Sequence, residues 1–205
     1  MRDYVQRFLT GFRKSPPRII VDSSLGSVFA NTVKDAGAGY TGTLENLRPK
    51  DLVHFELNSK LVESMKRNDS NFLAPWDPKV THKPSDYDRK IQLQDDRWQT
   101  LRFVASITWF HEFCHAFVTF LAGNNYADTP PGVTNAAFQD PEDTAGESGF
   151  WTETRAFAGC ALMDPSTPNG DPEEAVRVYL VNDNDDCRDV NTRTMREMMT
   201  HPKSM

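Results

Sequence analysis

The strongest hydrophobic pattern in the chain runs from Asp96 to Ala122, where there is no glycine or proline and apolar residues are most frequent. Asp95 or Asp96 can cap the N-terminus of a helix over this stretch, and Gly123-Asn124 provides a left-handed stop at its end. Apolar residues occupy nearly all sides of this helix rather than one stripe. The pattern therefore predicts a long helix that is buried in the protein.

Shorter patterns predict the other elements. Residues 52–58 alternate apolar and polar side chains, which is typical of a half-buried strand, and β-branched runs favour strands over 18–22 and 177–181. We expect helices over 1–12, 25–36, 60–67, 144–158 and 191–200, the fourth of them opened by a capping box of Thr144 and Glu147. The segments 68–90 and 124–143 are expected to be loops, since proline and short polar residues are frequent there.

These elements place the chain in the α+β class. We expect one domain, because 205 residues is an ordinary length for a single domain. In the N-terminal part, residues 1–123, a small mixed sheet packs on the long helix. Residues 124–205 are expected to be mainly helical and to close the other side of a cleft between the two parts.

Composition narrows the possible partners. The net charge is −6 and no basic stripe runs along the chain, which excludes a nucleic-acid partner. No window reaches the roughly 18 apolar residues of a membrane span, so no membrane partner is expected. Three cysteines, and an N-terminus without the apolar run of a signal peptide, favour the inside of a cell unless a leader was removed. Localisation and oligomeric state stay open.

The long helix contains His111-Glu112-Phe113-Cys114-His115, an HExxH motif. Two histidines four residues apart lie one turn apart on one face of a helix, so both imidazoles can bind a single tetrahedral ion. Glu112 lies beside that face, where its carboxylate can take a proton from water without binding the ion. Burying these three groups without a ligand would be costly. The motif therefore predicts a zinc site with His111 and His115 as ligands and Glu112 as general base.

On this motif and a glutamate in a later helix, the chain resembles the gluzincins, a group of zinc peptidases of the zincin type. The resemblance covers roughly residues 98–163. It implies a compact, single-domain, zincin-like fold and one zinc ion (Zn2+) per chain. It also implies hydrolysis of a peptide or protein substrate, with Glu112 passing the proton from water to the leaving amine. The third zinc ligand of the group is the later glutamate.

Two glutamates can supply that third ligand. Several gluzincin branches place it in an ExxA sequence, to which Glu153–Ala156 is similar, whereas the aminopeptidase branch has Asn-Glu-Gly, to which the sequence from Glu147 is similar with one extra residue. Glu153 would be the lone carboxylate on a packed helix face whose small residues, such as Gly149, permit close approach, and this favours Glu153. Glu147 is the alternative ligand, although it can instead serve as the reciprocal cap of Thr144 in the capping box. If Glu147 is the ligand, Glu153 contacts a metal ligand or the substrate amine.

Further residues are candidates for substrate binding. A strand that precedes the metal helix can pair with an extended peptide if it lies at a sheet edge. We expect this of the strand His54, Phe55, Glu56, Leu57 and Asn58. A donor to the developing oxyanion is expected as well, and the unranked candidates are Tyr126, Arg155, Tyr179 and His201.

Two other functions are compatible with the sequence. One is a zincin-like protein whose metal site serves binding or regulation with little peptidase activity, although the intact Glu112 argues against it. The other is a metal-free interaction domain in which the HExxH sequence occurs by chance. The metal content of the purified protein separates this second function from the first and from a peptidase.

Overall fold

The computed structural model describes residues 2–35, 48–69, 84–122, 129–138, 145–165 and 175–200. Its elements are α1 (Arg2–Lys14), β1 (Ile19–Asp22), β2 (Ala30–Lys34), β3 (Val53–Asn58), α2 (Ser59–Asn68), α3 (Pro84–Ala122), α4 (Ser148–Phe157), β4 (Cys160–Pro165), β5 (Ala175–Val181), β6 (Cys187–Val190) and α5 (Thr192–Thr200). Helices and small sheets together confirm the α+β class. None of the described helices combines the length and the apolar composition needed to cross a membrane.

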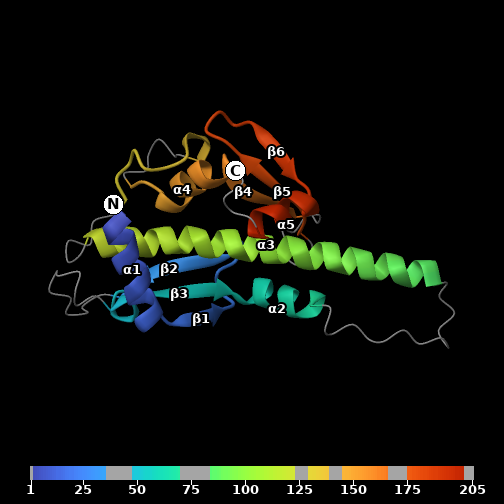
Figure 1. Cartoon of the computed structure of the whole chain (residues 1–205), viewed down its shortest axis with the longest axis horizontal. Helices are drawn as coiled ribbons and strands as arrows, with labels where there is room; N and C mark the ends of the chain where they lie inside the picture. The colour runs from blue at the N-terminus through green and yellow to red at the C-terminus, as the bar shows by residue number, and fades with distance from the viewer. Residues whose placement is uncertain are drawn as a thin grey trace.

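The long helix α3 is the central element, and the rest of the chain lies on two sides of it (Figure 1). On one side is a mixed sheet of order β1-β3-β2, in which β1 is parallel and β2 antiparallel to β3. The helices α1 and α2 pack beside this sheet (Figure 1). On the other side is an antiparallel sheet of order β4-β5-β6, together with α4 and α5. The small mixed sheet beside the long helix is confirmed.

Aromatic residues join α3 to the first sheet. Phe8 of α1, Val53 and Phe55 of β3, and Ala116 and Phe120 of α3 form one buried cluster. The ring centroids of Phe8 and Phe120 are 5.4 Å apart. Each fully buried side chain of this size contributes about 1.5–3 kcal/mol to folding. The cluster therefore fixes the C-terminal half of α3 against the sheet.

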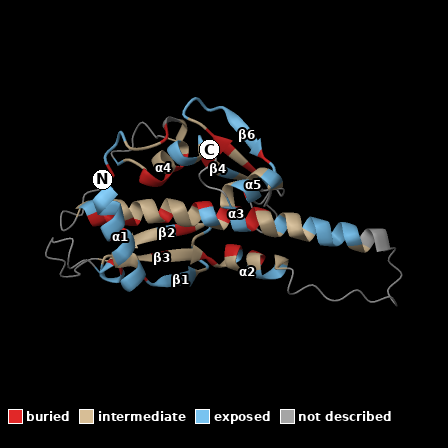
Figure 2. Cartoon of the chain, in the orientation of Figure 1, coloured by how far each residue is buried: buried red, intermediate tan, exposed pale blue. Residues whose placement is uncertain are grey.

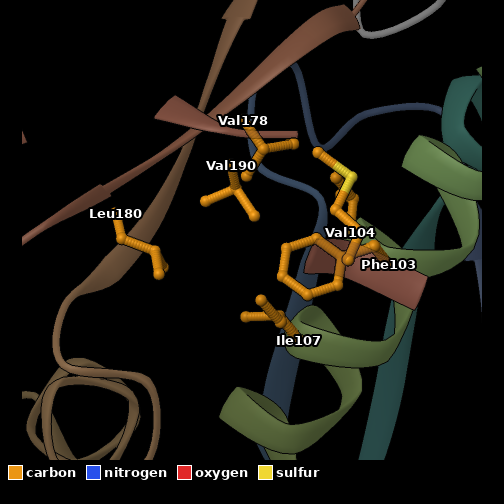
Figure 3. Close-up of a cluster of buried hydrophobic side chains, with 7 residues drawn as sticks. Phe103, Val104, Ile107, Val178, Leu180 and Val190 are labelled. Atoms are coloured by element: carbon orange, nitrogen blue, oxygen red, sulfur yellow. The ribbon is translucent and has the colours of Figure 1, made fainter. Parts of the chain in front are cut away.

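A second cluster joins the other side of α3 to the second sheet. Figure 3 shows residues of α3 facing Val178 and Leu180 of β5 and Val190 of β6. The buried members of this cluster are Phe103, Val104, Ile107, Val178, Leu180, Val190 and Met195. Because α3 has apolar partners on both sides, none of its residues 107–120 is exposed, in agreement with the burial that its sequence pattern predicts. Its N-terminal end is exposed over residues 88–93 (Figure 2).

The prediction of a mainly helical C-terminal half is wrong, because this half contains the second sheet. Its strand β5 was predicted over 177–181, but β4 and β6 were not. The Ala-Leu-Met run in β4 consists of residues with high helix propensity. It is a strand because it pairs in antiparallel register with β5, a contact that local propensity does not contain.

The predicted helix over 25–36 is also wrong. Its second half is β2, which pairs with β3 from Ala30 opposite Leu57 to Lys34 opposite Val53. The buried side chain of Asn58 holds the preceding turn, since its amide donates to the carbonyls of Gly26 and Val28. These partners lie about 30 residues away in the sequence, so the local pattern could not supply them.

Two helix starts differ from the prediction. α3 begins at Pro84, inside the predicted loop 68–90, and proline suits the first turn because its φ angle is already helical. α4 begins at Ser148 rather than Thr144, and Glu147 is its N-cap, with a carboxylate that accepts a hydrogen bond from Gly149 N. Thr144 lies outside the described residues. The remaining helices and strands were predicted within a few residues of their observed bounds.

Candidate metal centre

His111 and His115 lie one turn apart on the face of α3 that α4 crosses. Their ring centroids are 5.0 Å apart, and both rings are mostly buried. Gly149 in the first turn of α4 makes this crossing close, because a Cβ atom there would come within 2.4 Å of three ring atoms of His111. The prediction that a small residue permits this approach is confirmed.

Glu147, at the start of α4, faces both histidines. Its Oε1 atom lies 3.3 Å from Nε2 of His111 and 2.5 Å from Nε2 of His115. The three ligand atoms lie within 4.8 Å of one another, and this group could hold a metal ion. Ligand atoms about 2.0–2.1 Å from a tetrahedral zinc ion are about 3.3 Å apart, so small adjustments bring all three into range.

Glu153 does not join this group, and the geometry favours Glu147 over Glu153 as third ligand. The Oε1 atom of Glu153 lies 2.6 Å from Nδ1 of His111, on the opposite side of the ring from Nε2. Its Oε2 atom accepts a hydrogen bond of 2.9 Å from Ala161 N in β4. The preferred sequence assignment assumed that a lone buried carboxylate must meet the ion. Here it meets an imidazole and a backbone N–H instead.

Both histidines have a partner at Nδ1. For His115 the partner is Ser148, whose Oγ atom lies 3.2 Å from Nδ1 and whose side chain is buried. A partner that accepts a hydrogen bond from Nδ1–H keeps the proton on Nδ1, so that Nε2 is deprotonated and free to bind an ion. The sequence does not point to Ser148, because a serine that follows an N-cap carries no signal of its own. Its role depends on the crossing of α3 and α4.

The surroundings of His111 favour positive charge. Burial lowers the pKa of His111, but hydrogen bonds to Glu147 and Glu153 and their negative charges outweigh it and raise that pKa to about 10. Burial raises the pKa of Glu147, but hydrogen bonds from His111 and His115 outweigh it and lower that pKa to about 2. The space between the carboxylate and the imidazoles is therefore electrostatically suited to a cation.

Glu112 is buried and stands apart from the ligand group. Its Oε2 atom accepts a hydrogen bond of 2.6 Å from the hydroxyl of Thr32 in β2. Thr32 Oγ1 also lies 3.1 Å from the Glu112 carbonyl oxygen. The strand thus fixes this carboxylate beside the two histidines. The sequence pattern does not point to Thr32, because it predicts a helix over 25–36 in place of β2.

The predicted edge strand is wrong, because β3 lies in the middle of its sheet with partners on both sides. His54 bonds to Asp35 at 2.8 Å, Phe55 belongs to the core, and Asn58 caps α2. The other two members, Glu56 and Leu57, pair with β1 and β2. Among the described strands, β2 is the edge strand beside Glu112.

The described candidates for the oxyanion donor do not approach the group formed by His111, His115 and Glu147. Arg155 is exposed on α4, where its guanidinium lies 3.7 Å from the ring centroid of Trp151. Tyr179 alternates in β5 with the buried Val178 and Leu180, which face α3, so its side chain points to the opposite face of the sheet. Tyr126 and His201 lie outside the described residues.

Comparison of the chain with protein-family models, with curated proteins and with solved structures found no significant match. The chemistry of this centre therefore has to follow from its own residues.

We expect Gly149→Ala to weaken metal binding about 10- to 100-fold, because the added methyl group displaces the His111 ring from its position. Zinc titration calorimetry measures this change. Gly132→Ala is the matched control, since a Cβ atom at Gly132 meets nothing within 4 Å. Equal zinc affinities of the two variants would contradict the close contact between α4 and His111.

Proposed function

We propose that the chain is a zinc-dependent peptidase in which His111, His115 and Glu147 hold the ion and Glu112 is the general base. The observation that carries this proposal is the convergence of two imidazole nitrogens and a carboxylate oxygen within 4.8 Å. Beside them lies a separate, buried carboxylate on the same helix. This arrangement supports hydrolysis, because catalysis needs a proton acceptor that is not itself a ligand.

The donor set fits zinc. Two neutral imidazoles and one carboxylate are a ligand set of catalytic zinc sites, in which a fourth position stays open for water or substrate. Each histidine has its Nδ1 atom against an acceptor, Glu153 for His111 and Ser148 for His115. Such contacts orient the ring and make Nε2 a better ligand. When bound, zinc supplies the Lewis acidity that lowers the pKa of water and polarises a carbonyl group.

Residues of the chain supply the proton transfer and hold the reacting groups in position. Glu112 accepts a proton as water adds to the carbonyl carbon of the substrate, and it gives this proton to the amine as the C–N bond breaks. Thr32 holds the Glu112 carboxylate in place through its 2.6 Å hydrogen bond. Glu153 and Ser148 keep the two rings turned towards Glu147. The products are a carboxylic acid and an amine.

Strand β2 offers a route for the peptide main chain. The carbonyl of Phe29 and the N–H of Asp35 bond to β3 and its flank, and backbone groups alternate in direction along a strand. The N–H and carbonyl groups of Ala30 and Thr32 therefore face away from β3. An extended peptide that pairs with this edge would lie beside Glu112.

The ligand assignment predicts about one zinc per chain in the wild type. We expect Glu147→Ala to lose zinc affinity by more than about 100-fold, because it removes a ligand. Glu153→Ala should lower the zinc affinity by only about 10- to 100-fold, because it removes the hydrogen-bond partner of His111 Nδ1 and not a ligand. Plasma mass spectrometry and zinc titration measure both. Retained zinc in Glu147→Ala, with loss in Glu153→Ala, would restore Glu153 as the ligand.

The general base is tested by Glu112→Gln. We expect this variant to bind zinc as the wild type does and to lose about 10²–10⁴-fold in kcat, because an amide cannot accept the proton from water. Cleavage of a mixed peptide library, followed by mass spectrometry, measures turnover. Undiminished cleavage by Glu112→Gln would remove Glu112 from its role. Zinc binding without cleavage by the wild type would instead favour a regulatory metal site.

The hydrogen bond from Thr32 to Glu112 predicts a loss of activity without a loss of zinc. Thr32→Val keeps the shape of the side chain but removes the hydroxyl that donates to Glu112, so we expect kcat to fall roughly tenfold with zinc content unchanged. Thr32→Ser keeps the hydroxyl and should restore most of the rate. Steady-state kinetics and zinc analysis of both variants check this. An equal loss in both would indicate a packing role for Thr32.

A further inference from the structure

A pocket of about 430 Å³ lies next to the metal centre. Its walls are residues 27–30, which lead into β2, the stretch 104–112 of α3, the α4 side chains of Phe150 and Glu153, and residues 161–163 of β4. The pocket thus lies between the edge strands of the two sheets, with α3 along it. Its volume lies within the range of ligand pockets, about 300–1,000 Å³.

The wall of the pocket is apolar away from the metal centre. Ala30, Val104 and Ile107 are buried, and Phe150 and Met163 contribute further apolar surface. The residues that line the pocket include no lysine, arginine or aspartate. A charged group in this part would lose its hydration without gaining a partner, whereas an apolar group would gain from burial.

The charged lining residues gather at the end near the metal centre, and each has a partner there. His111 contacts Glu153 through Nδ1, and Glu112 accepts the hydrogen bond from Thr32. Glu153 also accepts from Ala161 N. Each charged lining group thus has a polar partner, and the apolar part of the pocket is left to select the substrate.

We propose that this pocket binds an apolar side chain, of the size of leucine, methionine or phenylalanine, in a substrate residue that flanks the cleaved bond. The inference rests on the proposed peptidase function and names its substrate class. The contact of the pocket with both His111 and Glu112 places the bound residue next to the reacting carbonyl. The pocket selects against lysine, arginine, aspartate and glutamate at this position.

Val28 provides the variant that tests the pocket. It lines the pocket, yet its side chain is 52% exposed, so a polar substitution there leaves the core intact. Val28→Asp introduces a negative charge at the pocket. Val21→Asp is the matched control, because Val21 is 55% exposed in β1, at the far edge of the same sheet, and is not part of the pocket lining.

The experiment uses the zinc-loaded full chain and peptides of one sequence, in which the residues flanking the bond are varied among Ala, Leu, Phe, Lys and Glu. We expect kcat/KM for Leu or Phe to exceed that for Ala by about 10- to 100-fold at one of these positions. Val28→Asp should lower this preference about tenfold and raise the relative rate with Lys, while Val21→Asp should match the wild type. Cleavage without preference for an apolar residue, or an equal fall for all peptides in Val28→Asp, overturns the inference.

A binding measurement separates this inference from the proposed function. Zinc-loaded Glu112→Gln is titrated with the Leu, Ala and Lys peptides, and anisotropy gives the dissociation constants. Tighter binding of the Leu peptide that is lost in the Val28→Asp, Glu112→Gln double variant supports the pocket, even if the wild type cleaves nothing. Cleavage by the wild type without such a difference in binding supports the peptidase and contradicts the pocket.

Discussion

The close crossing of α4 over α3 at Gly149 is the constraint on which the candidate metal centre depends. Only a residue without a Cβ atom lets the helix backbone lie against the His111 ring. This contact brings the residue before α4 to one side of the ring and Glu153, inside α4, to the other. Without it, neither carboxylate would reach an imidazole nitrogen, and α3 would carry two buried histidines without partners.

The two sheets hold this crossing in place. The first sheet fixes α3 through the aromatic cluster around Phe55 and Phe120, and it presents Thr32 to Glu112. The second sheet fixes α4 from the other side, since Ala161 in β4 donates its N–H to Glu153. A buried helix packed on both faces moves little, and this rigidity keeps the ligand atoms within reach of a common point.

The parts of this centre that the sequence predicted are those that depend on neighbouring residues alone. The spacing of His111 and His115 on a helix sets their common face, and no tertiary contact is needed for that. The choice between Glu153 and Glu147 could not be made from the sequence alone, because it depends on where α4 begins relative to the two histidines. Thr32 was missed because its strand pairs with β3 and meets a helix 80 residues away in the sequence. Alternating apolar residues predicted β3 as a strand, but not its place in the middle of the sheet.

Three carboxylates lie close together where α4 crosses α3: Glu112 on α3, Glu147 at the start of α4 and Glu153 inside α4. Their hydrogen-bond partners differ. Glu153 is bound on both oxygens, by His111 and by a backbone N–H, so it has little capacity left for an ion or a substrate. Glu147 faces two Nε2 atoms and is half-exposed, which suits the proposed ligand beside an open position. Glu112 accepts a hydrogen bond from the Thr32 hydroxyl, and this contact fits its proposed role as the proton acceptor. The roles proposed for the three glutamates, structural for Glu153, ligation for Glu147 and proton transfer for Glu112, thus follow from what each one touches.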